Sequence, residues 1–145
     1  MNNNRQNNDF TFESAHSKRV SFLIITKNRG PDLAKLIEAA KELAGPDDEL
    51  IVIDGGSTDN TLSIIDHNRG KIDVFVSEPD VSASHANNKG ILLASGKYIR
   101  HISNDETIHH EAMEQAVAML EKHPEIDLLV CGGTKQFGSG SIFSF

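Results

Sequence analysis

The stretch E-L-I-V-I-D-G-G-S-T-D-N-T, residues 49–61, decides the fold of this chain. Residues 50–53 form an unbroken apolar run rich in β-branched side chains, which is typical of a strand buried on both faces. Asp54 ends this run, and the two glycines after it permit a turn with positive φ or a close backbone approach. The Ser-Thr-Asp triplet at 57–59 then offers hydroxyl caps and a carboxylate at a helix start. The pattern predicts a strand, a turn and a helix that face a ligand, although a plain βα turn has the same spacing.

Strand and helix patterns alternate on both sides of this stretch. Apolar β-branched runs predict strands, and apolar residues at helical spacing predict amphipathic helices. The predicted strands cover residues 20–25, 50–53, 72–76, 98–102 and 126–131, and the predicted helices cover residues 31–43, 59–68, 84–94 and 111–122. This alternation predicts an α/β fold: a Rossmann-like, doubly wound, mostly parallel sheet in three α/β/α layers.

Three polar clusters follow predicted strands, at residues 26–29, 54–59 and 103–106. Right-handed crossovers and short connections predict the order 3-2-1-4 for the first four strands. Ligands of such sheets bind beyond the carboxyl ends of the strands, where the strand order reverses, which is here between strands one and four. The convergence of the three clusters at that edge predicts a binding site.

The composition limits the class of protein. The chain has 145 residues, which fits one domain, and its 14 basic and 21 acidic residues give a formal net charge of -7. An acidic balance argues against a nucleic-acid partner, whereas a nucleotide ligand needs only a few local donors. A single cysteine excludes an intrachain disulfide and fits a reducing compartment. Since no apolar run has the length of a membrane span and no signal peptide opens the chain, we expect a soluble, cytoplasmic protein.

The first 17 residues differ in character from the rest. Residues 1–17 are rich in Asn and poor in aliphatic side chains, so we expect a disordered tail there. Residues 18–145 then form the predicted domain.

Several motifs along the chain belong together. They are V-S at 20–21, T-K-N at 26–28, I-V-I-D-G-G-S-T-D-N-T at 51–61, S-E-P-D at 77–80, N-K-G-I at 88–91, A-S-G-K-Y-I at 94–99 and S-N-D-E at 103–106. With them, residues 20–131 resemble the nucleotide-sugar-binding half of family 2 glycosyltransferases, the inverting enzymes of the GT-A fold. The resemblance implies binding of a nucleotide-diphosphate sugar, expected to be a UDP-sugar, for inverting transfer of the sugar to an acceptor hydroxyl. The nucleotide-sugar-binding residues that it implies are Thr26, Asn28, Asp54, Gly56, Asp80, Asn88, Lys89, Asn104 and Asp105.

Two positions depart from the family pattern. Position 55 is Gly where many relatives have a second acid, so a base or ribose contact is lost or replaced. Ser103 stands at the first acid of the family's metal-binding D-x-D, so Asp105 alone matches a carboxylate of that motif, with Glu106 next to it. The resemblance implies Mg²⁺ or Mn²⁺ at Asp105 and Glu106, since a divalent cation neutralises the leaving diphosphate. The open alternative is that these residues cap the helix that follows.

The acceptor side is the least defined part of this prediction. In the family the general base comes from a later segment, so we expect it beyond Phe145, with the acceptor half missing or truncated and little transfer by this chain alone. The acceptor that the resemblance implies is a saccharide or a lipid-linked one. Two other functions stay open: a non-catalytic nucleotide-binding or regulatory module with the same sheet, and an unrelated doubly wound protein such as a receiver or flavodoxin-like domain.

Overall fold

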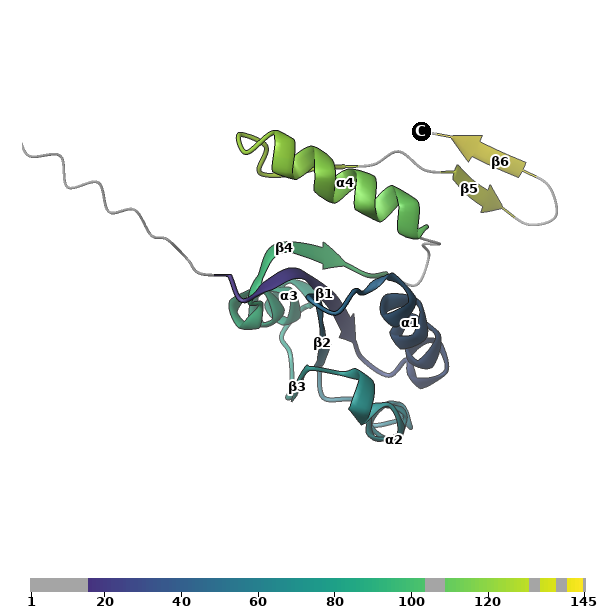
Figure 1. Ribbon diagram of the computed structural model, residues 1–145. Helices are drawn as coiled ribbons and strands as arrows, with labels where there is room; N and C mark the ends of the chain where they lie inside the picture. The colour runs from purple at the N-terminus through teal and green to yellow at the C-terminus, as the bar shows by residue number, and fades with distance from the viewer. Residues whose placement is uncertain (1–15, 104–108, 131–133, 138–140, 145) are drawn as a thin grey trace, which may run out of the picture.

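The computed structural model describes residues 16–103, 109–130, 134–137 and 141–144. Its centre is a parallel sheet in the order β3-β2-β1-β4, as the sequence predicts (Figure 1). The strands are β1 (Lys18–Thr26), β2 (Glu49–Asp54), β3 (Val74–Ser77) and β4 (Gly96–His101). The helices are α1 (Gly30–Leu43), α2 (Thr61–His67), the short 3₁₀ helix η1 (Arg69–Lys71), α3 (Ala83–Leu93) and α4 (His110–Lys122). The four strands of this sheet and helices α1 to α4 begin and end within two residues of their predicted bounds.

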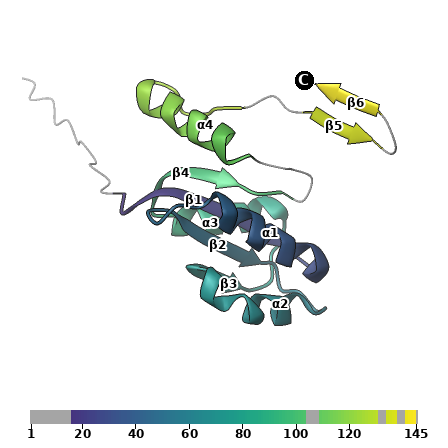
Figure 2. The ribbon, with the colours of Figure 1, turned by 45° about the vertical axis from the view of Figure 1, so that its right-hand side comes forward.

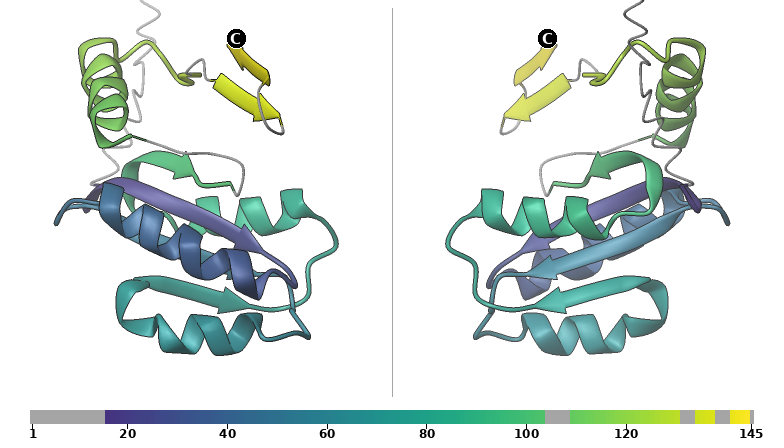
Figure 3. Two further views of the ribbon diagram at one scale, coloured as in Figure 1. Left: turned by 90° about the vertical axis from the view of Figure 1, so that its right-hand side faces the viewer. Right: turned by 90° about the vertical axis from the view of Figure 1, so that its left-hand side faces the viewer.

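The helices cover the sheet on both faces, which confirms the predicted layers. Strand residues alternate between the faces, so that Phe22 and Val52 pack against α1, α2 and α4. Their neighbours Leu23 and Ile51 pack against Ala86 of α3 on the opposite face. Figure 3 shows the two faces, with α1 nearest the viewer in one view and α3 in the other. Because β1 and β2 are covered on both faces, each contains an unbroken apolar run, at residues 22–25 and 50–53.

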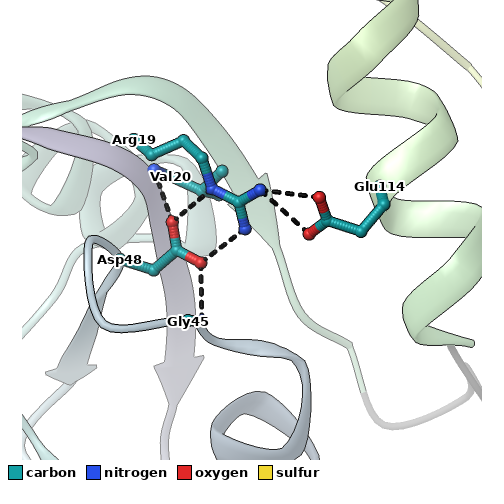
Figure 4. A network of polar contacts seen from close by, with 5 residues as sticks. All are labelled: Arg19, Val20, Gly45, Asp48 and Glu114. Atoms are coloured by element: carbon teal, nitrogen blue, oxygen red, sulfur yellow. Dashed lines mark hydrogen bonds and ion pairs between the residues drawn. The ribbon is translucent and has the colours of Figure 1, made fainter.

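An ion-pair network joins α4 to the sheet (Figure 4). From β1, Arg19 donates to Asp48 through Nε at 3.0 Å and Nη2 at 2.8 Å, and to Glu114 of α4 through Nη1 at 2.9 and 2.8 Å. Asp48 also accepts from the backbone N–H groups of Val20 at 3.1 Å and Gly45 at 2.8 Å. Burial alone raises the pKa of Asp48, but the bonds from Arg19 and these amides outweigh burial and hold the pKa below its ordinary value.

A second ion pair, between Lys97 of β4 and Glu121, lies farther along α4 at 2.7 Å. The helix lies beside the β4 end of the sheet (Figure 2). Polar contacts at two places along its length therefore attach α4 to β1 and β4.

The predicted fifth strand at 126–131 is wrong. Residues 126–130 belong to no strand, and Cys131 lies outside the described residues. Leu128 and Val130 are 78% and 80% exposed, so this apolar run joins no core within the described part of the chain. An apolar run becomes a strand only where a neighbour pairs with its backbone, and no described strand does so here. Two strands farther on, β5 (Thr134–Phe137) and β6 (Ser141–Ser144), pair with each other in antiparallel fashion.

The predicted tail at 1–17 falls largely outside the description, which begins at His16. Strand β1 then begins at Lys18.

Candidate functional site

The carboxyl ends of three neighbouring strands lie in register. Thr26 of β1 pairs with Asp54 of β2, and Asp54 pairs with Ser77 of β3. Gly55 N–H donates to the carbonyl of Thr26 at 2.9 Å, which continues the ladder into the turn after β2. Thr26 and Asp54 were both predicted from the sequence, and the sheet brings them together.

Asp54 holds the turn that follows it. The residue has no exposed surface. One carboxylate oxygen accepts from Ser57 N–H at 3.0 Å and from Ser77 Oγ at 2.7 Å, and the other accepts from Ser57 Oγ. By accepting hydrogen bonds from the turn that follows it, the Asp54 carboxylate fixes the conformation of that turn. The predicted contact of Asp54 with a nucleotide stays a prediction.

Asn28 ties the loop after β1 to the same turn. Its N–H donates to Ser57 Oγ at 2.7 Å, and its Oδ1 accepts from Thr58 N–H at 2.7 Å. Its backbone is left-handed, with φ 53°, a conformation that Asn tolerates better than most residues. The loops after β1 and β2 are therefore joined by hydrogen bonds. Because Asn28 and Thr58 lie 30 residues apart in the sequence, the sequence alone does not predict this contact.

Gly56 brings a third loop against this unit. Its φ is 76°, and a Cβ at this position would lie 3.2 Å from the Cα and N of Pro79. Both the backbone conformation and the close approach of the loop after β3 thus require glycine. Glu78 N–H donates to the carbonyl of Asp54 at 3.0 Å and fixes the start of that loop.

Asp80 and Lys89 form an ion pair between this loop and α3. Lys89 Nζ lies 2.5 Å from Asp80 Oδ1 and 2.8 Å from Glu78 Oε1, and the bonds to Asp80 and then to Glu78 raise the pKa of Lys89. His85 Nδ1 lies 3.3 Å from the same Asp80 oxygen. The family resemblance implied Asp80 and Lys89 as separate binding residues. Nothing in the sequence indicated that they pair with each other, that Glu78 contacts Lys89 or that His85 contacts Asp80.

Asn88, the neighbour of Lys89, faces another part of the molecule. It lines an open groove of about 400 Å³ between α3 and β4. The groove is bordered by Leu23, Ser84, Asn87, Asn88, Ile91, Ile99 and His101. Of the two residues from the N-K-G-I motif, therefore, one contacts Asp80 and the other lies beside β4.

The predicted metal ligands Asp105 and Glu106, together with Asn104, lie outside the described residues. Elsewhere, the described ranges contain no group of three or more His, Cys, Asp or Glu side chains that could hold a metal ion. In the same ranges, no helix has both the length and the apolar character to cross a membrane.

Comparison with known proteins points to one family. The model of the family "Glycosyl transferase family 2" matches residues 21–141. The poly(ribitol-phosphate) beta-N-acetylglucosaminyltransferase TarS of Staphylococcus aureus is 25% identical over 117 residues, which are 77% of this chain and 20% of that protein. The chain spans 20% to 44% of the length of the curated relatives that it matches.

Two solved structures share the fold. The crystal structure of S. aureus TarS 1-349 in complex with UDP-GlcNAc has a TM-score of 0.64 at 22% identity, over 73% of this chain and 32% of that one. The mannosyltransferase PcManGT from Pyrobaculum calidifontis, in complex with GDP-Man and Mn²⁺, has a TM-score of 0.61 at 22% identity, over 74% of this chain and 33% of that one.

Proposed function

Since the chain belongs to glycosyl transferase family 2, we propose that it is the donor-binding part of a glycosyltransferase and takes up a nucleotide-diphosphate sugar at the carboxyl edge of β1 and β2. The joining of three loops at this edge carries the proposal. Asn28, Asp54 and Gly56 hold the loops after β1, β2 and β3 against one another. Loops that are ordered in advance lose less conformational entropy when a ligand binds.

The donor that we propose is a UDP-sugar, transferred with inversion to a hydroxyl of a saccharide or lipid-linked acceptor. UDP-GlcNAc in the TarS complex and GDP-Man in the PcManGT complex support a nucleotide sugar as ligand. In this proposal Thr26, Asn28 and Asp80 border the nucleotide. Asp54 acts through its turn, because it has no exposed surface.

We further propose that Asp105 and Glu106 hold Mg²⁺ or Mn²⁺. Their carboxylate oxygens are the ligands that these hard cations prefer. Ile102 N–H donates to the carbonyl of Leu23 at 2.9 Å, so the chain leaves β4 at the carboxyl edge just before these residues. When bound, such a cation neutralises the charge that develops on the leaving nucleoside diphosphate. The Mn²⁺ in the PcManGT complex supports this assignment.

Titration calorimetry with UDP tests the proposal, in Mn²⁺ and in chelator. We expect the wild-type chain to bind UDP more tightly in Mn²⁺, and Asp105→Ala to lose about 10- to 100-fold in affinity in Mn²⁺ but little in chelator. Glu106→Ala is expected to lose less. Absence of UDP binding in both conditions would reject the donor site, and equal losses for Asp105→Ala in both would reject the metal.

A further inference from the structure

The groove between α3 and β4 has apolar side chains that reach solvent. Helices α1, α2 and α4 cover one face of the sheet, whereas α3 is the only helix on the other face within the described part of the chain (Figure 3). Ile91 of α3 and Ile99 of β4 line the groove of about 400 Å³ and are 49% and 43% exposed. Apolar side chains gathered in a groove favour a segment that covers them.

The groove has an apolar end and a polar end. Helix α3 leads from the carboxyl end of β3 to the start of β4, so Ile91, in its last turn, lies toward the amino edge of the sheet. Ile99 precedes His101 along β4 and lies on the same side as Ile91. The polar lining lies toward the carboxyl edge and consists of Ser84, Asn87, Asn88 and His101. A segment that covers the apolar end therefore leaves the carboxyl edge open.

The N-terminal segment of the chain joins the fold at this apolar end. Lys18 N–H donates to the carbonyl of Ser95 at 3.3 Å, and Lys18 pairs with Gly96 in the sheet. Ser95 comes two residues after the end of α3, and Gly96 is the first residue of β4. Residues 1–15, which lie outside the description, are thus attached beside the last turn of α3 and the start of β4 (Figure 1).

This N-terminal segment contains two phenylalanines in a polar context. Residues 9–13 read D-F-T-F-E, and Phe10 and Phe12 are the only aromatic residues among the first 17. In an extended chain, side chains two residues apart point to the same side, so both rings share one side and Thr11 takes the other. Alternation of apolar and polar residues is typical of an extended segment with one buried face.

The length of this segment is sufficient for the contact. Phe12 precedes Lys18 by six residues, which span about 20 Å when extended. Ile99 pairs with Ser21, three residues beyond Lys18, and therefore lies about 10 Å along the sheet from it. The chain before Lys18 can thus turn back and reach the apolar end of the groove.

We infer that residues 9–13 fold back over this groove as an extended segment, with Phe10 and Phe12 packed on Ile91 and Ile99. The driving force is the removal of two phenyl rings and two isoleucine side chains from water. The disorder that the sequence predicts for the tail then applies to residues 1–8. No nucleotide takes part in this contact, so the inference does not depend on the proposed function.

Solution NMR on the full chain tests the contact. We expect nuclear Overhauser contacts between the ring protons of Phe10 or Phe12 and the methyl protons of Ile91 and Ile99. The double variant Phe10→Ser/Phe12→Ser should lose them, and the methyl resonances of Ile91 and Ile99 should shift. Ile64 of α2 is the internal control, because it packs on the opposite face of the sheet and its methyl resonances should stay unchanged.

Thermal unfolding measures the contribution of the two rings. Phe10→Ser/Phe12→Ser should lower Tm by about 3–6 °C, because part of the gain from burying the rings is offset by the entropy cost of ordering the segment. Thr11→Ser is the matched control, since Thr11 faces away from the groove in the proposed arrangement, and its Tm should equal that of wild type.

Three outcomes would overturn the inference. The first is the absence of contacts from both rings to Ile91 and Ile99. The second is an unchanged Tm with unchanged methyl resonances in the double variant. The third comes from a mixture of isotope-labelled and unlabelled chains, in which contacts found only between chains would show that a second copy supplies the segment. A chain that shows the intramolecular contacts but binds no UDP refutes the proposed function and leaves this inference standing.

Discussion

Removal of Arg19 should destabilise the fold more than removal of its carboxylate partner on α4, Glu114. We consider Arg19→Met, which keeps the aliphatic stem and deletes the charge, beside Glu114→Gln. The side chain of Asp48 is 0% exposed, whereas those of Arg19 and Glu114 are 31% and 41% exposed. The two ion pairs of one guanidinium thus lie in different surroundings, and their contributions to stability should differ accordingly.

The expected magnitudes follow from this burial. Deleting one partner of a fully buried ion pair costs about 3–5 kcal/mol, because the other charge stays buried without compensation. Two backbone amides still bond Asp48 and water reaches the partly exposed Arg19 position, so we expect about 2–3 kcal/mol for Arg19→Met. The exposed pair with Glu114 is worth about 0.5–1 kcal/mol, which is the expected loss for Glu114→Gln. Glu121→Gln, which breaks the exposed pair with Lys97, should resemble Glu114→Gln.

Urea unfolding followed by circular dichroism measures the losses in the free energy of unfolding. A pH series then tests whether the loss in Arg19→Met comes from the charge of Asp48. The folded-state pKa of Asp48 lies below its unfolded value, so the stability that it contributes is present above the unfolded pKa of about 3.9 and is lost as pH falls through the folded pKa. The difference between wild type and Arg19→Met should therefore be constant from about pH 7 to 5 and shrink below about pH 4. Equal losses for Arg19→Met and Glu114→Gln, or a difference that persists unchanged in acid, would refute this reasoning.

Two further substitutions test the loops at the carboxyl edge. Gly56→Ala should lower the free energy of unfolding by about 1–2 kcal/mol, because position 56 has a left-handed backbone. Gly70→Ala is the control and should change it little, because a Cβ there meets nothing within 4 Å. Equal thermal melts for the two variants would contradict the close approach at Gly56. Asn28→Gly keeps the left-handed backbone and loses only the bond to Thr58, whereas Asn28→Ala also strains that backbone. Asn28→Ala should therefore be less stable than Asn28→Gly by about 1 kcal/mol in urea unfolding. The reverse order would show that backbone strain is unimportant at this position.

Much of the fold follows from local patterns in the sequence. The continuous apolar runs of β1 and β2 identify strands buried on both faces, and the spacing of Leu33, Ile37 and Ala40 identifies the inner face of α1. The right-handed crossover rule then leaves the order 3-2-1-4, which puts Thr26 beside Asp54. These features are predictable because side-chain periodicity and chain handedness act over a few residues or a single βαβ unit.

The same local reasoning failed at residues 126–131, where an apolar run has the composition of a strand. Leu128 and Val130 are exposed, and the run pairs with no described strand. Composition reports that a segment tolerates an extended conformation, but a strand exists only where another backbone satisfies its N–H and C=O groups.

At the candidate site, the sequence by itself determined which residue types end the strands: Thr26 and Asp54, then Gly56 in the turn and Asp80 in the next loop. Only the tertiary structure decided what each of them does. It buries Asp54 beneath the turn and pairs Asp80 with Lys89, which leaves one Asp80 oxygen facing Gly55. The physical reason is that hydrogen bonds and ion pairs depend on distances of about 3 Å between loops far apart along the chain, and these distances are set by the packing of strands and helices and not by sequence spacing.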